Sequence, residues 1–147
     1  MADIIRSPYV LVGQSDAGAH LIYDAGFGYA TRLLGYWIRE KKIMSLEEGV
    51  RKLTFMVASI FGLRDRGLIR PGMAADLVVF DPATVRECEP EMVQDLPGNE
   101  RRLIQKATGI EATIVNGEVL VQRGEHTGAL PGAVLGNGNG SALQAAA

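Results

Sequence analysis

The feature that most constrains the fold is a short apolar run, residues 9–12, that has no parallel partner elsewhere in the chain. Such a run is typical of a parallel strand that is covered on both faces, although a buried turn of helix has the same pattern. Residues 1–6 are expected to end a helix, because Ser7 precedes Pro8 and is disfavoured in the helical conformation. Parallel strands need parallel neighbours. We therefore expect this chain to supply one strand of a larger sheet.

Two amphipathic helices are expected to follow. Apolar residues recur at helical spacing over residues 30–40, which predicts the first helix. The second begins at Ser45, whose hydroxyl can cap it while Glu48 completes a capping box, and Gly62 is its expected C-terminal stop. Its expected apolar face consists of Leu46, Val50, Leu53, Val57 and Ile60.

The second half of the chain has the pattern of antiparallel strands. Pro71-Gly72 suits the central pair of a type II turn, and residues 75–80 form a β-rich run after it. Residues 110–115 and 118–122 flank Asn116-Gly117, which is a strong hairpin signal. Three antiparallel strands make a poor sandwich alone, so this half also reads as part of something larger.

The sequence divides into three parts, with the fold class α/β plus β. Residues 1–66 are expected to hold the parallel-type strand and its helices, and residues 67–127 the antiparallel strands. Within the second part, residues 83–107 are charged and contain prolines, which predicts an ordered excursion outside the core. Residues 128–147 form a tail of glycine and small residues, whose end we expect to be mobile.

Composition argues against several classes of function. The 147 residues carry a formal net charge of -2, which gives no electrostatic case for binding nucleic acid or an anionic membrane. No apolar run approaches the ~20 residues that cross a bilayer, and no leader-peptide pattern is visible. The single cysteine, Cys88, cannot form an internal disulfide. These features predict a soluble cytoplasmic protein.

A carboxylate and an imidazole lie in the polar turn after the apolar run, in V-G-Q-S-D-A-G-A-H at residues 12–20. From the residues alone, Asp16 is more often a turn or helix cap than a ligand. His20 either faces a substrate or is bonded to neighbouring backbone, and both alternatives stay open. Tyr23, Tyr29 and Arg32 follow the turn. They could reach a substrate carboxylate, but a place on the helix surface or in helix packing is the more common role.

Three stretches together resemble the C-terminal end of the amidohydrolase superfamily, and within it the N-acyl-D-amino-acid deacylases, or D-aminoacylases. They are residues 12–20, G-L-I-R-P-G-M-A-A-D-L-V-V-F-D-P at residues 67–82, and A-T-I-V-N-G-E-V-L-V-Q-R-G-E-H-T-G-A-L-P-G at residues 112–132. The second stretch is similar to the whole superfamily, whereas the first and third point to the deacylase branch. The resemblance spans nearly the whole chain in the right order.

The resemblance implies a fold and a chemistry. The fold would be the last strand and helices of a TIM-like (β/α)8 barrel, followed by part of a small β-sandwich domain. Asp16 matches the family's metal-site aspartate, so it would be a metal ligand and the general base and acid. His20, Ser15 and Gly18 are then candidates for contacts around the metal or with the substrate. The implied cofactor is Zn²⁺, and the implied reaction is hydrolysis of a non-peptide C–N amide bond, such as that of a small N-acyl-D-amino acid.

The chain departs from the family pattern in its metal ligands. It lacks the family's His-x-His pair and has only two histidines, His20 and His126; nothing in the sequence assigns a role to His126. Asp16, His20 and Cys88 make three ligands by count, but Cys88 has no ligand spacing around it. A barrel also needs roughly 250 residues.

We therefore expect a partial chain that is inactive alone and whose partner is the missing N-terminal barrel portion. The alternatives are a stand-alone, non-catalytic module that self-associates through exposed strand edges, and a split protein that assembles with a separately encoded piece.

Overall fold

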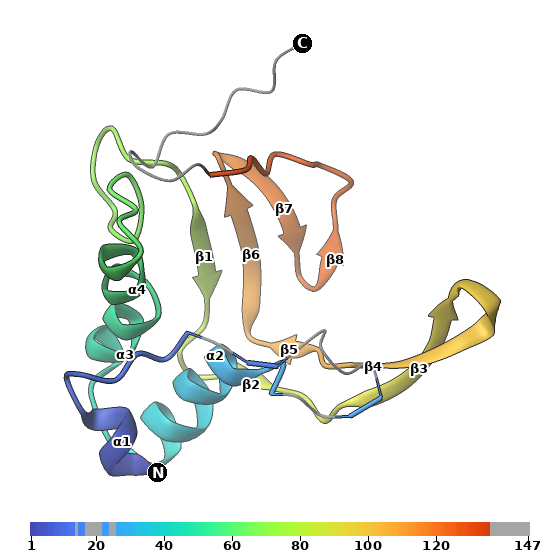
Figure 1. Ribbon diagram of the computed structural model, residues 1–147, viewed down its shortest axis with the longest axis horizontal. Helices are drawn as coiled ribbons and strands as arrows, with labels where there is room; N and C mark the ends of the chain where they lie inside the picture. The colour runs from blue at the N-terminus through green and yellow to red at the C-terminus, as the bar shows by residue number, and fades with distance from the viewer. Residues whose placement is uncertain (14, 17–21, 24–25, 136–147) are drawn as a thin grey trace.

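The computed structural model describes residues 1–13, 15–16, 22–23 and 26–135. It has a helical part and a β part that lie side by side (Figure 1). The helical elements are α1 (Ala2–Arg6), α2 (Tyr29–Arg32), the π-helix η1 (Leu33–Glu40), α3 (Leu46–Leu53) and α4 (Phe55–Ile60). The β part contains β1 (Leu77–Phe80), β2 (Arg86–Glu87), β3 (Glu91–Leu96), the 3-10 turn η2 (Pro97–Asn99), β4 (Glu100–Ile104), β5 (Ala107–Thr108), β6 (Ile110–Val115), β7 (Glu118–Gln122) and β8 (Glu125–His126).

The first expected helix is confirmed, as α2 continuing into η1. Its apolar stripe packs inward: Leu33, Leu34 and Ile38 are buried, and they form the core cluster together with Val85 from the β part. The apolar residues at helical spacing predicted this helix correctly, because their side of the helix packs against Val85 of the β part. The π-helical geometry of η1 has no signal in the pattern.

The second expected helix is capped by Ser45, as predicted, but it is interrupted in its middle. The Ser45 hydroxyl accepts the backbone N–H of Glu48 at 3.2 Å, as the cap requires, whereas the Glu48 carboxylate accepts from the Arg51 guanidinium instead of closing the capping box. Thr54 has φ −122° and ψ −82°, so the helix breaks there into α3 and α4. Ile60 is consequently 65% exposed, because the break interrupts the periodicity on which its expected burial depended.

The parallel strand expected over residues 9–12 is not among the strands of the described residues, and since its expected neighbours lie outside this chain, it stays a prediction. Tyr9 and Val10 belong to a turn in which the Val10 N–H donates to the Ser7 carbonyl at 3.3 Å, and Tyr9 is 94% exposed. The strand pairs among the described residues are all antiparallel. A parallel strand exists only through a parallel neighbour, and the described residues offer none. Val12 nevertheless packs against the core.

The four-stranded sheet has the order β1-β6-β7-β8 and contains the expected hairpin. Asn116 and Gly117 have φ angles of 48° and 85°, the two positive values that a type I′ turn needs between β6 and β7. The Pro71-Gly72 turn is also present: Gly72 has φ 84°, and the Met73 N–H donates to the Arg70 carbonyl at 3.2 Å. The sequence missed β8, which is too short to leave a pattern.

The charged excursion is ordered, as expected, but it is not outside the core. Strands β3 and β4 form a two-stranded ribbon that projects away from the helices, and β2 pairs with β5 at its base (Figure 1). Val85, just before β2, is 0% exposed. A Cβ on Gly35 would lie 2.5 Å from the Val85 carbonyl oxygen, and one on Gly109 would lie 2.4 Å from its nitrogen. Two glycines thus let η1 and the start of β6 close on Val85.

A charged cluster joins the end of the helical part to the sheet. The Arg66 guanidinium binds the carboxylates of both Asp65 and Asp76, and it holds the pKa of Asp65 below its ordinary value. The other oxygen of Asp76 accepts the backbone N–H of Asn116 at 2.8 Å. Asp76 therefore connects the segment before β1 to the β6–β7 hairpin.

Candidate functional site

Asp16 lies at the start of a loop whose two ends lie next to each other. Asp16 is exposed and Ser15 is half-buried. A Cβ built on Gly26 would lie 3.7 Å from the Ser15 Cβ, so the chain leaves and returns at one place. Gly26 has φ 73°, a left-handed conformation that glycine adopts without strain. The predicted residues Gly18 and His20 lie outside the described residues.

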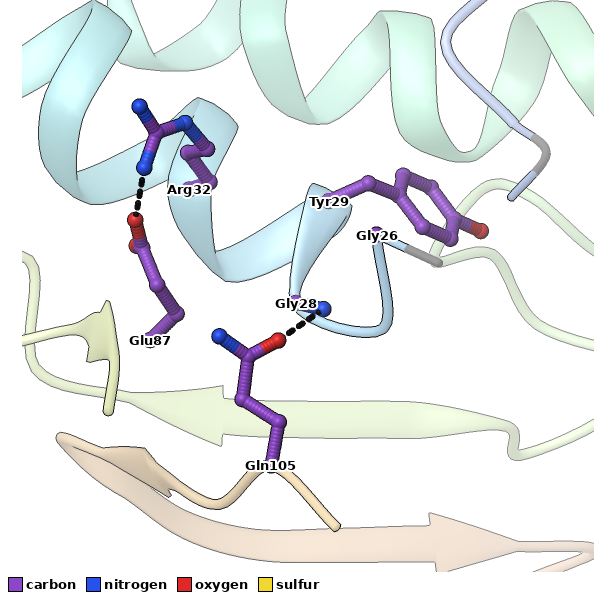
Figure 2. Close-up of a pocket in the computed structure, with 6 residues that line it drawn as sticks. All are labelled: Gly26, Gly28, Tyr29, Arg32, Glu87 and Gln105. Carbon is purple, nitrogen blue, oxygen red and sulfur yellow. Dashed lines mark hydrogen bonds and ion pairs between the residues drawn. The ribbon is translucent and has the colours of Figure 1, made fainter. Parts of the chain in front are cut away.

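A pocket of about 390 Å³ opens beside the returning end of the loop. Figure 2 shows that it lies between the start of α2 and the base of the excursion, and it is lined by Gly26, Gly28, Tyr29, Arg32, Glu87 and Gln105. The Gly28 N–H donates to Gln105 Oε1 at 2.7 Å. A Cβ on Gly28 would lie 2.8 Å from the Glu87 Cβ, so the close approach of α2 to Glu87 favours a glycine. No local sequence pattern indicates that Glu87 and Gln105 line this pocket.

The Arg32 guanidinium has two partners within this chain. Its Nη1 donates to Glu87 Oε1 at 2.7 Å (Figure 2). Its guanidinium carbon lies 4.8 Å from the centre of the Tyr36 ring. Both contacts hold the Arg32 guanidinium against other residues of this chain. The packing role expected for Arg32 is therefore favoured over direct recognition of a substrate carboxylate.

The described residues do not form a complete metal site. No three side chains of the types His, Cys, Asp and Glu cluster within the described part of the chain. Around Cys88, the backbone N–H donates to the Lys106 carbonyl and the carbonyl accepts from Gln105 Nε2, which places the residue in the β2–β5 connection. A zinc site takes about three protein ligands, so the described residues alone do not supply one.

His126 has a local structural partner. It lies in β8, is exposed, and its Nδ1 accepts the backbone N–H of Gly128 at 2.9 Å. This contact shapes the turn after β8 and accounts for a histidine to which the sequence assigned no role.

Comparison with known proteins identifies a family and several relatives that match most of this chain. The family model described as the amidohydrolase family matches residues 1–121. The N-acyl-D-aspartate deacylase of Alcaligenes xylosoxydans xylosoxydans is 40% identical over 114 residues, which cover 77% of this chain and 21% of the relative.

Two solved structures are similar in both sequence and shape. A D-aminoacylase whose crystal structure defines a novel subset of amidohydrolases has 38% identity and a TM-score of 0.55, over 69% of this chain and 20% of its own. The N-acyl-D-glutamate deacylase of Bordetella bronchiseptica, solved with zinc and a phosphonate inhibitor that mimics the tetrahedral intermediate, has 36% identity and a TM-score of 0.51, over 63% and 18%. The chain thus spans about a fifth of the length of the proteins it matches.

Proposed function

Because the chain belongs to the amidohydrolase family, we propose that it is the C-terminal part of a metal-dependent hydrolase that cleaves the non-peptide C–N amide bond of N-acyl-D-amino acids. The deacylase relatives at about 40% identity support the substrate class. The observation that carries the proposal for this chain is the exposed Asp16 at the start of a loop whose ends are held together. Such a loop can present a carboxylate to a reaction centre that other segments complete.

The proposed partner of the chain is the rest of the enzyme. The matched relatives are about five times longer than the matched segment, and the additional length in them is where further ligands and substrate contacts would lie. No helix among the described residues has the length and apolar character needed to cross a membrane. A cytoplasmic location follows from the lone Cys88 and is part of the proposal.

Zinc is the proposed cofactor of the complete enzyme, with Asp16 as one of its ligands. When bound, zinc lowers the pKa of a water molecule and polarises the scissile carbonyl. The support for zinc comes from the zinc-containing structure of the N-acyl-D-glutamate deacylase relative. Ser15, Gly18 and His20, which surround Asp16 in the sequence, are proposed to contact its carboxylate or the substrate.

The role proposed for Asp16 is proton transfer. A carboxylate next to the attacking water can accept its proton and then deliver that proton to the departing amine, which is otherwise a poor leaving group. The carboxylate must be accessible to do so, and Asp16 is exposed in the described structure. The expected products are a carboxylic acid and a free D-amino acid.

A chimera tests this role. The chain would replace the matching fifth of the N-acyl-D-aspartate deacylase, and D-aspartate release would be measured for the chimera and its Asp16→Asn variant. General acid–base catalysis typically contributes 10²–10⁴-fold, so kcat/KM should fall by about 100-fold or more with the melting temperature unchanged. Asp3→Asn, the same change on the exposed side of α1, is the matched control and should leave kcat/KM unaltered. Near-normal turnover of Asp16→Asn would contradict the proposal.

A further inference from the structure

A lysine on α3 is completely buried. Lys52 is 0% exposed and is the largest of the fully buried side chains among the described residues. An ammonium group removed from water is unfavourable unless hydrogen-bond acceptors replace the water. Lys52 Nζ has two such acceptors: it donates to the Ser7 carbonyl at 2.7 Å and to the Val10 carbonyl at 3.1 Å. Both bonds join α3 to a segment more than forty positions earlier in the chain.

The two carbonyls belong to the first and last residues of one turn. Ser7 has the extended conformation that Pro8 imposes on the residue before it, with φ −56° and ψ 131°. The Val10 N–H closes the turn on the Ser7 carbonyl. Since Lys52 binds both ends of this turn, the turn cannot open or move without leaving a buried ammonium without its acceptors.

The residues that follow this turn lie along α3 and α4 and continue toward Asp16. Val12 packs against the core, and a Cβ on Gly13 would lie 3.2 Å from Val57 Cγ2 on α4. Two residues further on, Ser15 lies against Gly26. In Figure 1 the N-terminal segment runs from α1 past α3 and α4 toward the start of α2. The location of Asp16 is thus determined by packing on α3 and α4, with Lys52 as its polar anchor.

We propose that Lys52 is a positioning residue: its ammonium fixes the turn at residues 7–10 and, through the segment that follows, the place of Asp16. The catalytic consequence rests on the proposed function, whereas the anchoring of the segment does not. The two parts are therefore tested by separate measurements.

The anchoring is tested by hydrogen exchange in the 147-residue chain. Lys52→Met keeps a similar volume and removes the donors. Amide exchange over residues 9–16 should accelerate at least tenfold, while exchange in β6 and β7 stays unchanged. Arg39→Met is the matched control, since it removes a bond of the same type, from Arg39 Nη1 to the Val85 carbonyl at 2.6 Å, at another site.

The control should leave the exchange of residues 9–16 unaltered. Lys52→Gln, which retains a neutral donor, serves if the methionine variant does not fold, and the same local acceleration is expected. Unchanged exchange over residues 9–16 in either folded variant overturns the anchoring.

The catalytic consequence is tested in the chimera. Lys52→Met should lower kcat at least tenfold with KM nearly unchanged, and Lys52→Arg, which keeps the charge and donors, should recover part of the loss. Asp76→Ala, which destabilises the fold at the β6–β7 hairpin and has no printed contact with residues 7–16, should lower the melting temperature and leave kcat intact. If Lys52→Met lowers only the melting temperature, the positioning role is wrong. An inactive unmutated chimera would instead contradict the proposed function, and the exchange experiment would still decide the anchoring.

Discussion

Val85 is the residue at which the helical part and the β part of the chain meet. Its side chain is fully buried against η1, and the backbone of Gly35 and Gly109 closes around it at distances that no larger residue allows. From the sequence, Val85 is expected to lie in an excursion outside the core, because charged residues dominate that segment. One apolar residue in a polar stretch leaves no periodicity, so its burial depends on tertiary contacts that a local pattern does not contain.

We predict that Val85→Ala destabilises the chain by about 2 kcal/mol, from two lost methyl groups and the cavity they leave. The free energy of unfolding from urea denaturation measures this. Val78→Ala is the control, because Val78 is 55% exposed on β1 and should lose only a few tenths of a kcal/mol. Equal losses in the two variants would show that Val85 is not a core residue.

The elements that the sequence predicted well are those whose signals are local. The Asn116-Gly117 hairpin, the Ser45 cap and the apolar stripe of η1 each depend on residues within one turn or one helix, and all three are confirmed. The strand expected over residues 9–12 depends on neighbours outside this chain and stays a prediction, whereas the turn at residues 7–10 that Lys52 binds leaves no pattern in the sequence. The break at Thr54 also has no local signal. The candidate site was recognisable as a motif, whereas its surroundings, Glu87 and Gln105, come from the excursion.

Asp76 links elements in a way that leads to a separate prediction. It is bound by the Arg66 guanidinium and accepts the Asn116 N–H, so Asp76→Ala removes two hydrogen bonds at once and leaves Arg66 with one carboxylate. Hydrogen bonds to charged groups contribute about 1.5–3 kcal/mol each, and Asp76 is partly accessible to water. We expect a loss of about 2 kcal/mol in the free energy of unfolding. Asp95→Ala, which breaks the exposed pair with Arg102 in the β3–β4 ribbon, is the control and should cost less than about 1 kcal/mol. The reverse order of the two losses would contradict the role of Asp76.

On the scale of the whole molecule, the described surface has exposed apolar residues and a strand edge, as expected for a chain that belongs to a larger assembly. Val78 and Val79 are adjacent on β1 and are 55% and 48% exposed, and β1 is an edge of its sheet. Phe61 and Ile69 are 72% and 87% exposed nearby in sequence. Edges and apolar surfaces of this kind associate with other chains unless they are covered. This surface is consistent with burial against the remainder of an enzyme or against a second copy of the chain.

We propose that this chain does in a deacylase-like enzyme what the matching segment does in the deacylase relatives. The most direct measurement is D-aspartate release from N-acyl-D-aspartate by the unmutated chimera, compared with the host deacylase lacking its matching fifth and with the isolated 147-residue chain. We expect the chimera to hydrolyse the substrate and neither part to do so alone. A chimera that folds and binds zinc but releases no D-aspartate would contradict it.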